Sequence, residues 1–329
     1  MQPQRLKHIK NIYPEIQGLL DWQKVVDASD LDAVAIATPL RYHYEMAKAS
    51  LLAGKHTLIE KPMASSTEQC EELIHLAERM GLVLLVGHTV LYSPAVRRMK
   101  EIVLAGDVGS IRYIGARRLN LGAFQKDINV LWDQAAHDLS TILYLMDEAP
   151  HTVNCSGGSH INRSIEDNTS TWLSFSNQRS ALIQNSWLEP RRVREMTVVG
   201  TRRMIVCDDV EMREKIKIYD TRVESPPYYD SFAEFQYSYH YGHVYIPHVA
   251  QEEPLRVECQ HFLDCILQGE IPLTCGHKGM EVVRILEACS ESLRSGGASV
   301  GLSRDIPARS DAQPASRSPD QGWAEPVMA

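Results

Sequence analysis

Two ionisable side chains four residues apart could exchange a proton with a ligand. They are Asp133 and His137, and they fall in a helix that we predict from Asp133 to Met146. A spacing of four places both on one helix face. Histidine titrates near neutral pH, which suits a general base, and an aspartate in the first turn is favoured by the helix dipole. The same pair also occurs on solvated helix faces, so the pattern alone leaves both interpretations open.

A strand–helix–strand unit precedes this helix in the chain. The apolar run Ala33 to Ala37 predicts a buried strand, Glu45 to Leu52 predicts a helix that Gly54 ends, and Thr57 to Ile59 predicts the next strand. Such a unit is the crossover of a parallel sheet. Ligands bind beyond the carboxyl ends of the strands in these sheets, so the residues at those ends are site candidates.

Polar residues follow directly after both strands. Thr38 and Pro39 follow the first strand, and Glu60 and Lys61 follow the second. Pro62 disfavours a helical backbone at Lys61 and keeps it extended at the strand end. The sequence therefore predicts a ligand site that includes Lys61, although a lysine after a core strand is also commonly a surface residue.

Five short motifs together resemble the glucose-fructose oxidoreductase, inositol dehydrogenase and MocA family, over about residues 10 to 300. The motifs are A-T-P-x-x-x-H from Ala37 to His43, A-G-K-H from Ala53 to His56, E-K-P from Glu60 to Pro62, V-G-H from Val86 to His88 and W-D-x-x-x-H-D from Trp132 to Asp138. Chance often produces E-K-P alone, so only the combination is specific.

The resemblance implies an NAD(P)-dependent oxidoreductase that acts on a secondary alcohol of a sugar, polyol or nucleotide-sugar. In the family, the lysine that matches Lys61 hydrogen-bonds the reacting hydroxyl, and we expect His137 to be the general base. Asp133 would orient or contact the substrate. Asp138 would either face the substrate or be structural.

The cofactor and substrate contacts are further expectations. Six residues match the family's cofactor cleft: Thr38, Pro39, His43, Glu60, Lys61 and His88. For His43 and His88, a satisfied buried histidine is an equal alternative. The cofactor would be NAD or NADP, with NAD favoured. Asn120 and Arg192, which follows Arg191, are candidates to bind a polar or anionic substituent of the substrate. We predict no metal, because no H-E-x-x-H is present and Cys259 and Cys265 are too widely spaced for a zinc knuckle.

The sequence departs from the family at its front. Dinucleotide-binding domains open with a strand, a G-x-G-x-x-G turn and a helix that holds the pyrophosphate. Here Gly18 is the one glycine before Gly54, and residues 1–14 have the apolar spacing of a helix. We expect roughly 30 to 40 preceding residues to be missing, which is about one βα unit and a strand. The residue that separates NAD from NADP would lie among them, and the chain as given would bind NAD weakly.

The predicted fold class is α/β. A truncated Rossmann-type parallel sheet would occupy residues 1–88, and an α+β domain with a large, open, mostly antiparallel sheet would occupy residues 89–302. Helices from Pro254 to Leu267 and from Gly276 to Arg294 are expected to pack back on the first domain. The aromatic segment 224–248 is left unplaced, and residues 303–329 have the composition of a disordered tail.

Composition excludes several classes of function. The chain has 329 residues, 44% of them hydrophobic, which suffices for two domains. The net charge of −8 argues against nucleic-acid binding, and no apolar run reaches the ~18 residues of a membrane span. Seven cysteines without C-x-x-C spacing indicate a reducing compartment, so we predict the cytoplasm. The family's open sheets usually pair between subunits, which implies a homodimer or homotetramer.

Two other functions remain open in the sequence. A relative that has lost catalysis would act as a binding or scaffold protein, and a third kind of member uses bound NAD transiently to cleave a glycoside. Cofactor titration separates the first alternative from a dehydrogenase, and product analysis separates the second. The motifs do not identify the substrate.

Overall fold

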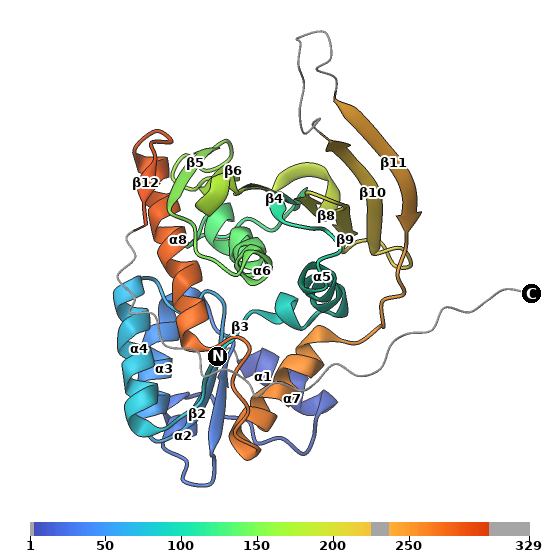
Figure 1. Cartoon of the computed structure of the whole chain (residues 1–329). Helices are drawn as coiled ribbons and strands as arrows, with labels where there is room; N and C mark the ends of the chain where they lie inside the picture. The colour runs from blue at the N-terminus through green and yellow to red at the C-terminus, as the bar shows by residue number, and fades with distance from the viewer. Residues whose placement is uncertain (1–2, 225–236, 303–329) are drawn as a thin grey trace, which may run out of the picture.

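The structure is a computed structural model that describes residues 3–224 and 237–302. It contains a three-stranded parallel sheet and a nine-stranded, mostly antiparallel sheet, with helices packed between and around them (Figure 1). The small sheet comes first in the chain and the large sheet follows it. This arrangement confirms the predicted fold class.

The parallel sheet has the order β1 (Ala33–Ile36), β2 (His56–Glu60) and β3 (Leu84–Gly87). Helices α3 (His43–Leu52) and α4 (Thr67–Met80) make the crossovers between these strands. Gly54 and Gly81, with φ of 76° and 66°, take the left-handed conformation that ends each helix. At the start of α4, the Ser66 hydroxyl accepts a hydrogen bond from the backbone N–H of Gln69 at 3.2 Å. The three strands run in one direction, so their carboxyl ends lie along one edge.

The large sheet has the strand order β11-β10-β9-β8-β4-β7-β6-β5-β12. Neighbouring strands are antiparallel except for β4 and β7, which are parallel. Burial alternates along most of these strands, as expected when one face of a sheet is covered. The strands are β4 (Ile111–Leu121), β5 (Thr152–Gly158), β6 (Asn168–Ser174), β7 (Ser180–Ser186), β8 (Leu188–Gly200), β9 (Met204–Asp208), β10 (Ile216–Glu224), β11 (Ser238–Tyr245) and β12 (Val300–Gly301).

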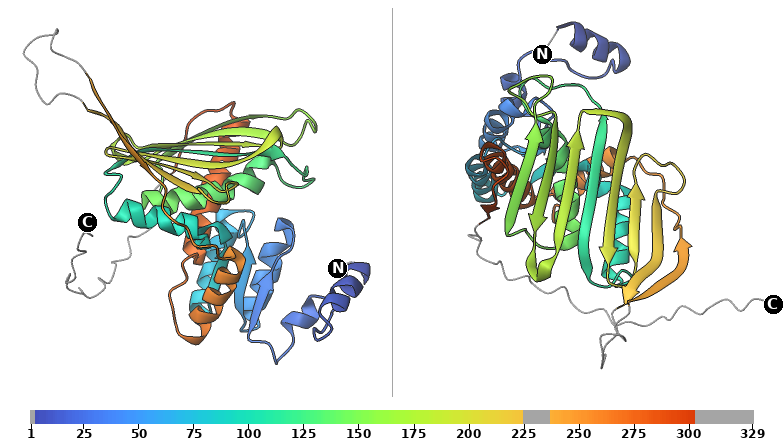
Figure 2. Two further views of the ribbon diagram at one scale, coloured as in Figure 1. Left: turned by 90° about the vertical axis from the view of Figure 1, so that its right-hand side faces the viewer. Right: turned by 90° about the horizontal axis from the view of Figure 1, so that it is seen from above.

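Helices cover one face of the large sheet and leave the other face open (Figure 2). The covering helices are α5 (Pro94–Leu104), α6 (Ala136–Met146) and α8 (Gly276–Arg294). Leu139 of α6 and Leu286 of α8 are fully buried in the same apolar cluster as Ile114 of β4 and Ile183 of β7. The principal core therefore lies between the sheet and these helices, which fixes α6 against the sheet.

The last two helices join the two halves of the molecule. Phe262 of α7 (Pro254–Leu267) packs against Leu58 and Leu85 of the parallel sheet. Met280 and Val283 of α8 belong to the cluster formed with α3 and α4, while the other side of α8 contacts the large sheet. Both helices have the predicted bounds. They hold the edge of the parallel sheet at a fixed position relative to α6.

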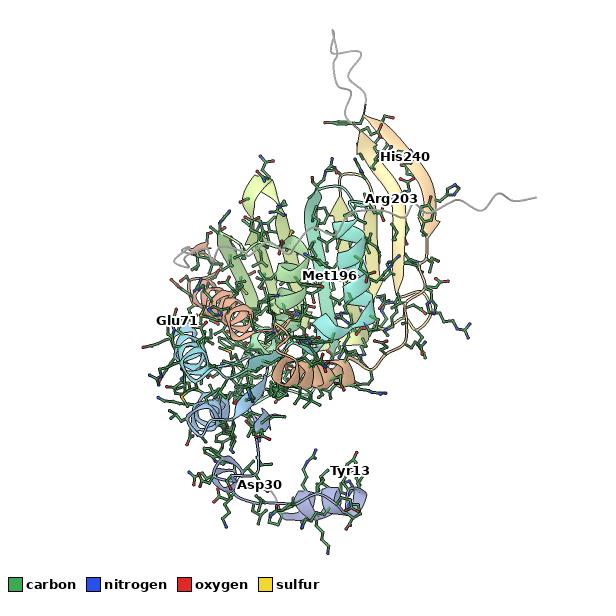
Figure 3. All side chains as sticks on the ribbon, turned by 60° about the horizontal axis from the view of Figure 1, so that its bottom comes forward. Tyr13, Asp30, Glu71, Met196, Arg203 and His240 are labelled. Carbon is green, nitrogen blue, oxygen red and sulfur yellow. The ribbon has the colours of Figure 1, made fainter. Side chains whose placement is uncertain are left out.

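Other parts of the chain contribute little to the core. Helix α1 (Pro3–Ile12) has no buried residue and lies apart from the sheets, like nearby Tyr13 (Figure 3). It is followed by the short α2 (Gln23–Val26). Part of the unplaced segment 224–248 forms β11 at the edge of the large sheet. Residues 225–236 and the expected disordered tail at 303–329 lie outside the described residues. Within the described ranges, no helix is long and apolar enough to cross a membrane.

Candidate active site

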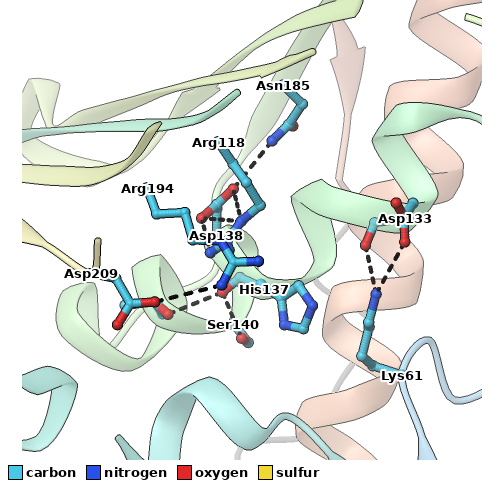
Figure 4. Close-up of polar contacts among 10 residues, drawn as sticks. Lys61, Arg118, Asp133, His137, Asp138, Ser140, Asn185, Arg194 and Asp209 are labelled. Carbon is cyan, nitrogen blue, oxygen red and sulfur yellow. Dashed lines mark hydrogen bonds and ion pairs between the residues drawn. The ribbon is translucent and has the colours of Figure 1, made fainter. Parts of the chain in front are cut away.

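Lys61 and Asp133, which are 72 residues apart in the chain, meet at the edge of the parallel sheet (Figure 4). The Lys61 ammonium donates a hydrogen bond to the Asp133 backbone oxygen at 2.6 Å, and its Nζ lies 3.6 Å from Asp133 Oδ1. Trp187 Nε1 donates to the other carboxylate oxygen at 3.3 Å. Burial lowers the pKa of Lys61, and the Asp133 carboxylate opposes that shift.

The helix that carries Asp133 and His137 begins differently from the prediction. A π-helical turn, η3 (Leu131–Ala135), precedes α6, so Asp133 lies in the π turn and His137 in the α-helix. Trp132 anchors the turn, because its indole N–H donates to Ser290 Oγ of α8 at 2.9 Å and its backbone N–H donates to Asn129 Oδ1 at 3.1 Å. Such turns occur frequently at functional sites.

His137 is half-buried and lines a cavity of about 420 Å³, together with Asp133, Asn120 and Trp187. Burial lowers the pKa of His137 well below its usual range, and the Lys61 and Arg118 cations lower it further. The imidazole is therefore neutral at neutral pH. A neutral histidine beside a cavity is able to accept a proton from a bound ligand.

Asp138 is held by the large sheet. Arg118 of β4 donates to both of its carboxylate oxygens, with Nη2 at 2.8 Å from Oδ1 and Nε at 3.2 Å from each oxygen. Asn185 of β7 donates to Oδ2 at 3.2 Å. Only 6% of the Asp138 side chain is exposed. Of the two roles expected for Asp138, the geometry favours the structural one, in the wall of the cavity.

The arginines that line the cavity, Arg118 and Arg194, are not the predicted one. Arg192 is exposed and is absent from the cavity lining, whereas Arg194, two residues further along β8, does line it and lies 3.7 Å from Asp209. Arg192 lies nearer the start of β8, outside the residues that line the cavity, so its substrate role stays a prediction that this cavity does not support. Burial and the neighbouring Arg118 cation lower the pKa of Arg194.

Arg118 and Arg194 are not among the site residues predicted from the sequence. A signal for Arg118 was available, since Ile114, Ala116 and Arg118 alternate along β4 and the first two face the core. A charged residue on the inward face of a strand marks a polar site. No equally local signal distinguishes Arg194 from the arginines beside it.

The predicted cofactor residues lie at the carboxyl ends of β1 and β2. The ring nitrogens of buried His43 lie 2.7 Å from the Thr38 backbone oxygen and 2.8 Å from the Pro62 backbone oxygen. His43 thus connects the segments that follow β1 and β2. Pro39 lies in the first of these segments, directly after Thr38. Glu60 Oε2 accepts a hydrogen bond from the Lys61 backbone N–H at 3.2 Å. Gly87 leaves room for Glu60, because a Cβ there would lie 3.1 Å from the Glu60 carboxyl carbon.

The remaining predicted residues are Asn120 and His88. The side-chain amides of Asn120 and Gln134 are in contact at 3.0 Å, and both residues line the cavity that contains His137. His88, at the end of β3, lines a second cavity instead. The structure therefore brings Lys61, Asp133, His137, Asp138 and Asn120 together and places His88 behind them.

The fold and this site define a two-sheet protein of the Rossmann type, with a polar cavity where the parallel strands end. Residues 4–88 match the model of the oxidoreductase family with an NAD-binding Rossmann fold, and residues 96–206 match that of the GFO/IDH/MocA C-terminal domain. The chain belongs to the GFO/IDH/MocA family, which confirms the resemblance seen in the motifs.

Individual relatives agree with this assignment. The chain is 31% identical over 189 residues to UDP-N-acetylglucosamine 3-dehydrogenase of Acidithiobacillus ferrooxidans, and the match covers 56% of each protein. It thus spans little more than half the length of that relative. The solved structure of the same enzyme superposes with a TM-score of 0.72 at 23% identity, over 90% of this chain and 88% of the other. The structure of an aldose-aldose oxidoreductase of Caulobacter crescentus superposes with a TM-score of 0.76 at 20% identity, over 92% of this chain and 89% of the other. At these identities the superpositions show the fold alone.

Proposed function

We propose that this protein is an NAD(P)-dependent oxidoreductase that acts on a secondary alcohol of a sugar, polyol or nucleotide-sugar. The observation that carries the proposal is that Asp133 and His137 line one cavity while Lys61, at the carboxyl end of a parallel strand, is bound to Asp133. The family assignment and a relative whose name states a nucleotide-sugar substrate support it.

The residues present suit the nicotinamide half of the cofactor. Glu60 and Lys61 lie at the strand end where such ligands bind, and within the described ranges Glu60 Oε2 accepts a hydrogen bond from the Lys61 backbone N–H alone. Its carboxylate has acceptor capacity left for a ribose hydroxyl. A nicotinamide cofactor, when bound, supplies the hydride acceptor or donor that no side chain can replace.

The protein side of the reaction is proton transfer and orientation. His137, neutral because it is buried among cations, takes the proton of the substrate hydroxyl during oxidation. Lys61 donates a hydrogen bond to the same oxygen and stabilises its developing negative charge. Asp133 holds the Lys61 ammonium at the cavity through its backbone oxygen and its carboxylate. Asn120 would bind a further hydroxyl group, and pairing through the open sheet face would give a homo-oligomer.

The test is reduction of NAD and of NADP by the purified protein with a panel of polyols, aldoses, uronic acids and UDP-sugars. We expect one group of these compounds to support turnover. His137→Ala should lower kcat by about 10²- to 10⁴-fold and leave nicotinamide binding, measured by ligand NMR, unchanged. His75→Ala, on the exposed face of α4, is the control and should leave kcat unchanged. Turnover that is equal in the His137 variant and the native protein would contradict the assignment of the base.

A further inference from the structure

A second cavity, of about 300 Å³, lies behind the proposed active site. The short helix η2 (Thr89–Tyr92) and helix α6 lie between the two cavities. In each of these helices, some residues line the first cavity and neighbouring residues line the second. Thr89 lines the first cavity, whereas His88 and Leu91 line the second. On α6, Thr141 lines the first cavity and Ser140 lines the second. Residues of η2 and of α6 therefore form the wall between the two cavities.

His88 is the unusual residue in this wall. It is 1% exposed, and neither ring nitrogen has a hydrogen-bond partner among the described residues. A buried polar group without a partner is destabilising, so ordered water normally satisfies it. The residues that line the cavity next to His88 include Ser140 and Glu281, whose polar side chains can serve as hydrogen-bond partners of water.

His88 also lies close to the proposed reacting groups. Burial and the Lys61 cation hold the pKa of His88 at about 3, so its ring is neutral at neutral pH. His88 is in turn among the groups that lower the pKa of His137. The hydroxyl of Ser140, in the second cavity, donates to the His137 backbone oxygen at 2.9 Å. A neutral imidazole has one donor and one acceptor nitrogen, so it can accept a proton on one side and release one on the other.

We propose that the second cavity is a water-filled route for the reaction's proton, and that the proton passes through His88. The inference rests on the proposed function, in which oxidation breaks the substrate O–H bond and leaves the proton on a His137 ring nitrogen. His137 then gives that proton, through water, to one nitrogen of His88. The other His88 nitrogen releases its own proton to water in the second cavity. One proton enters and one leaves, so the His88 ring stays neutral.

A separate route has a clear purpose in this geometry. A bound substrate would fill the first cavity during the reaction, and the proton would have no open path through it. The second cavity reaches solvent at Asp147 and Ala149, which are exposed. His137 can therefore regain its neutral form while the reactants are still bound. The same route, taken in reverse, would supply a proton for reduction of a ketone.

The first test needs no catalytic activity. NMR of protein with isotope-labelled histidine measures exchange of the His88 ring N–H with bulk water, and the signal is assigned by its loss in His88→Phe. We expect measurable exchange in the native protein and an exchange rate about tenfold lower in Ala149→Phe, which places a large ring at the cavity rim. Ala149→Ser is the matched control and should exchange like the native protein. A ring proton that is fully protected, or that Ala149→Phe leaves unchanged, would overturn the proposal.

The second test follows the reaction itself. Stopped-flow absorbance reports hydride transfer, and a pH indicator reports proton release in the same mixture. In His88→Phe, first-turnover hydride transfer should keep its rate, while proton release slows by about tenfold. Simultaneous hydride transfer and proton release in this variant would overturn the route. If His88→Phe does not fold, Ala149→Phe replaces it. A native protein that transfers no hydride would contradict the proposed function, whereas the exchange measurement would still decide the route.

Discussion

Two cation–aspartate pairs flank His137, and they are built differently. Lys61 and Asp133 are 3.6 Å apart, and 31% of the Asp133 side chain is exposed. Arg118 and Asp138 are joined at 2.8 Å with further contacts at 3.2 Å, and their side chains are 15% and 6% exposed. The first pair joins the π-helical turn η3 to the end of the parallel sheet, and the second joins α6 to the large sheet.

The difference shows which charge is available to a ligand. Lys61 has three donors and uses one on a backbone oxygen, so it can turn a donor toward a substrate without losing its anchor. Arg118 is fixed by a planar, two-oxygen contact that is specific in direction and would be lost if the guanidinium moved. We call Lys61–Asp133 the loose pair and Arg118–Asp138 the tight pair. We interpret the loose pair as part of the reaction and the tight pair as a support for α6.

The largest expected effect comes from breaking the tight pair. Asp138→Ala would leave the buried Arg118 guanidinium without its counter-ion, and should lower the free energy of unfolding by about 3 to 5 kcal/mol. Urea unfolding followed by circular dichroism measures this. The double variant Arg118→Met, Asp138→Leu is the control and should recover most of the loss, because it removes both charges. If Asp138→Ala lowered the free energy of unfolding by no more than the loss of an exposed ion pair does, the tight pair would not be a structural support.

A smaller effect, confined to activity, is expected from the loose pair. Lys61→Met removes a hydrogen bond to the reacting oxygen and should lower kcat by about 10²-fold, the lower end for such groups. The free energy of unfolding should change by less than about 1 kcal/mol, since Lys61 is already disfavoured as a buried cation. Parallel kinetics and urea unfolding separate the two quantities. Large destabilisation with unchanged kcat would reverse our assignment of the pairs.

A third effect is a gradual dependence of stability on pH. Burial lowers the pKa of His137 and of His88, the latter to about 3, whereas both bind protons near pH 6.5 when unfolded. The unfolded state therefore binds more protons below that pH, and stability falls as the pH decreases. Each histidine contributes a slope of up to about 1.4 kcal/mol per pH unit.

The contribution of one histidine can be isolated. His88→Phe should reduce the slope of unfolding free energy against pH between about pH 6.5 and pH 4. His75→Phe, on the surface of α4, should leave the slope unchanged. Equal slopes in the native protein and the His88 variant would show that His88 does not stay neutral when buried.

Local signals in the sequence accounted for much of the fold. The bounds of α7 and α8 agree with the periodic segments, and the alternating runs from residue 169 onward form strands. Local signals did not predict local structure that depends on a contact with a residue far away in the chain. The sequence indicated Asp133 at the start of a regular helix, but Trp132 is tied to Ser290 and the helix opens with a π turn. The sequence offered Arg192, next to Arg191, as a substrate contact, whereas Arg194 is the arginine of β8 that lines the cavity.

The sequence by itself determined the family, the order of strands and helices, and the residue types of the proposed active site. These depend on spacing and side-chain chemistry, which are properties of short segments. Only the tertiary structure decided that Lys61 is anchored by Asp133, that His137 is neutral and that His88 lies between two cavities. Burial and charge proximity set these properties. Both arise from the packing of α6 between the two sheets, which no segment of the chain specifies alone.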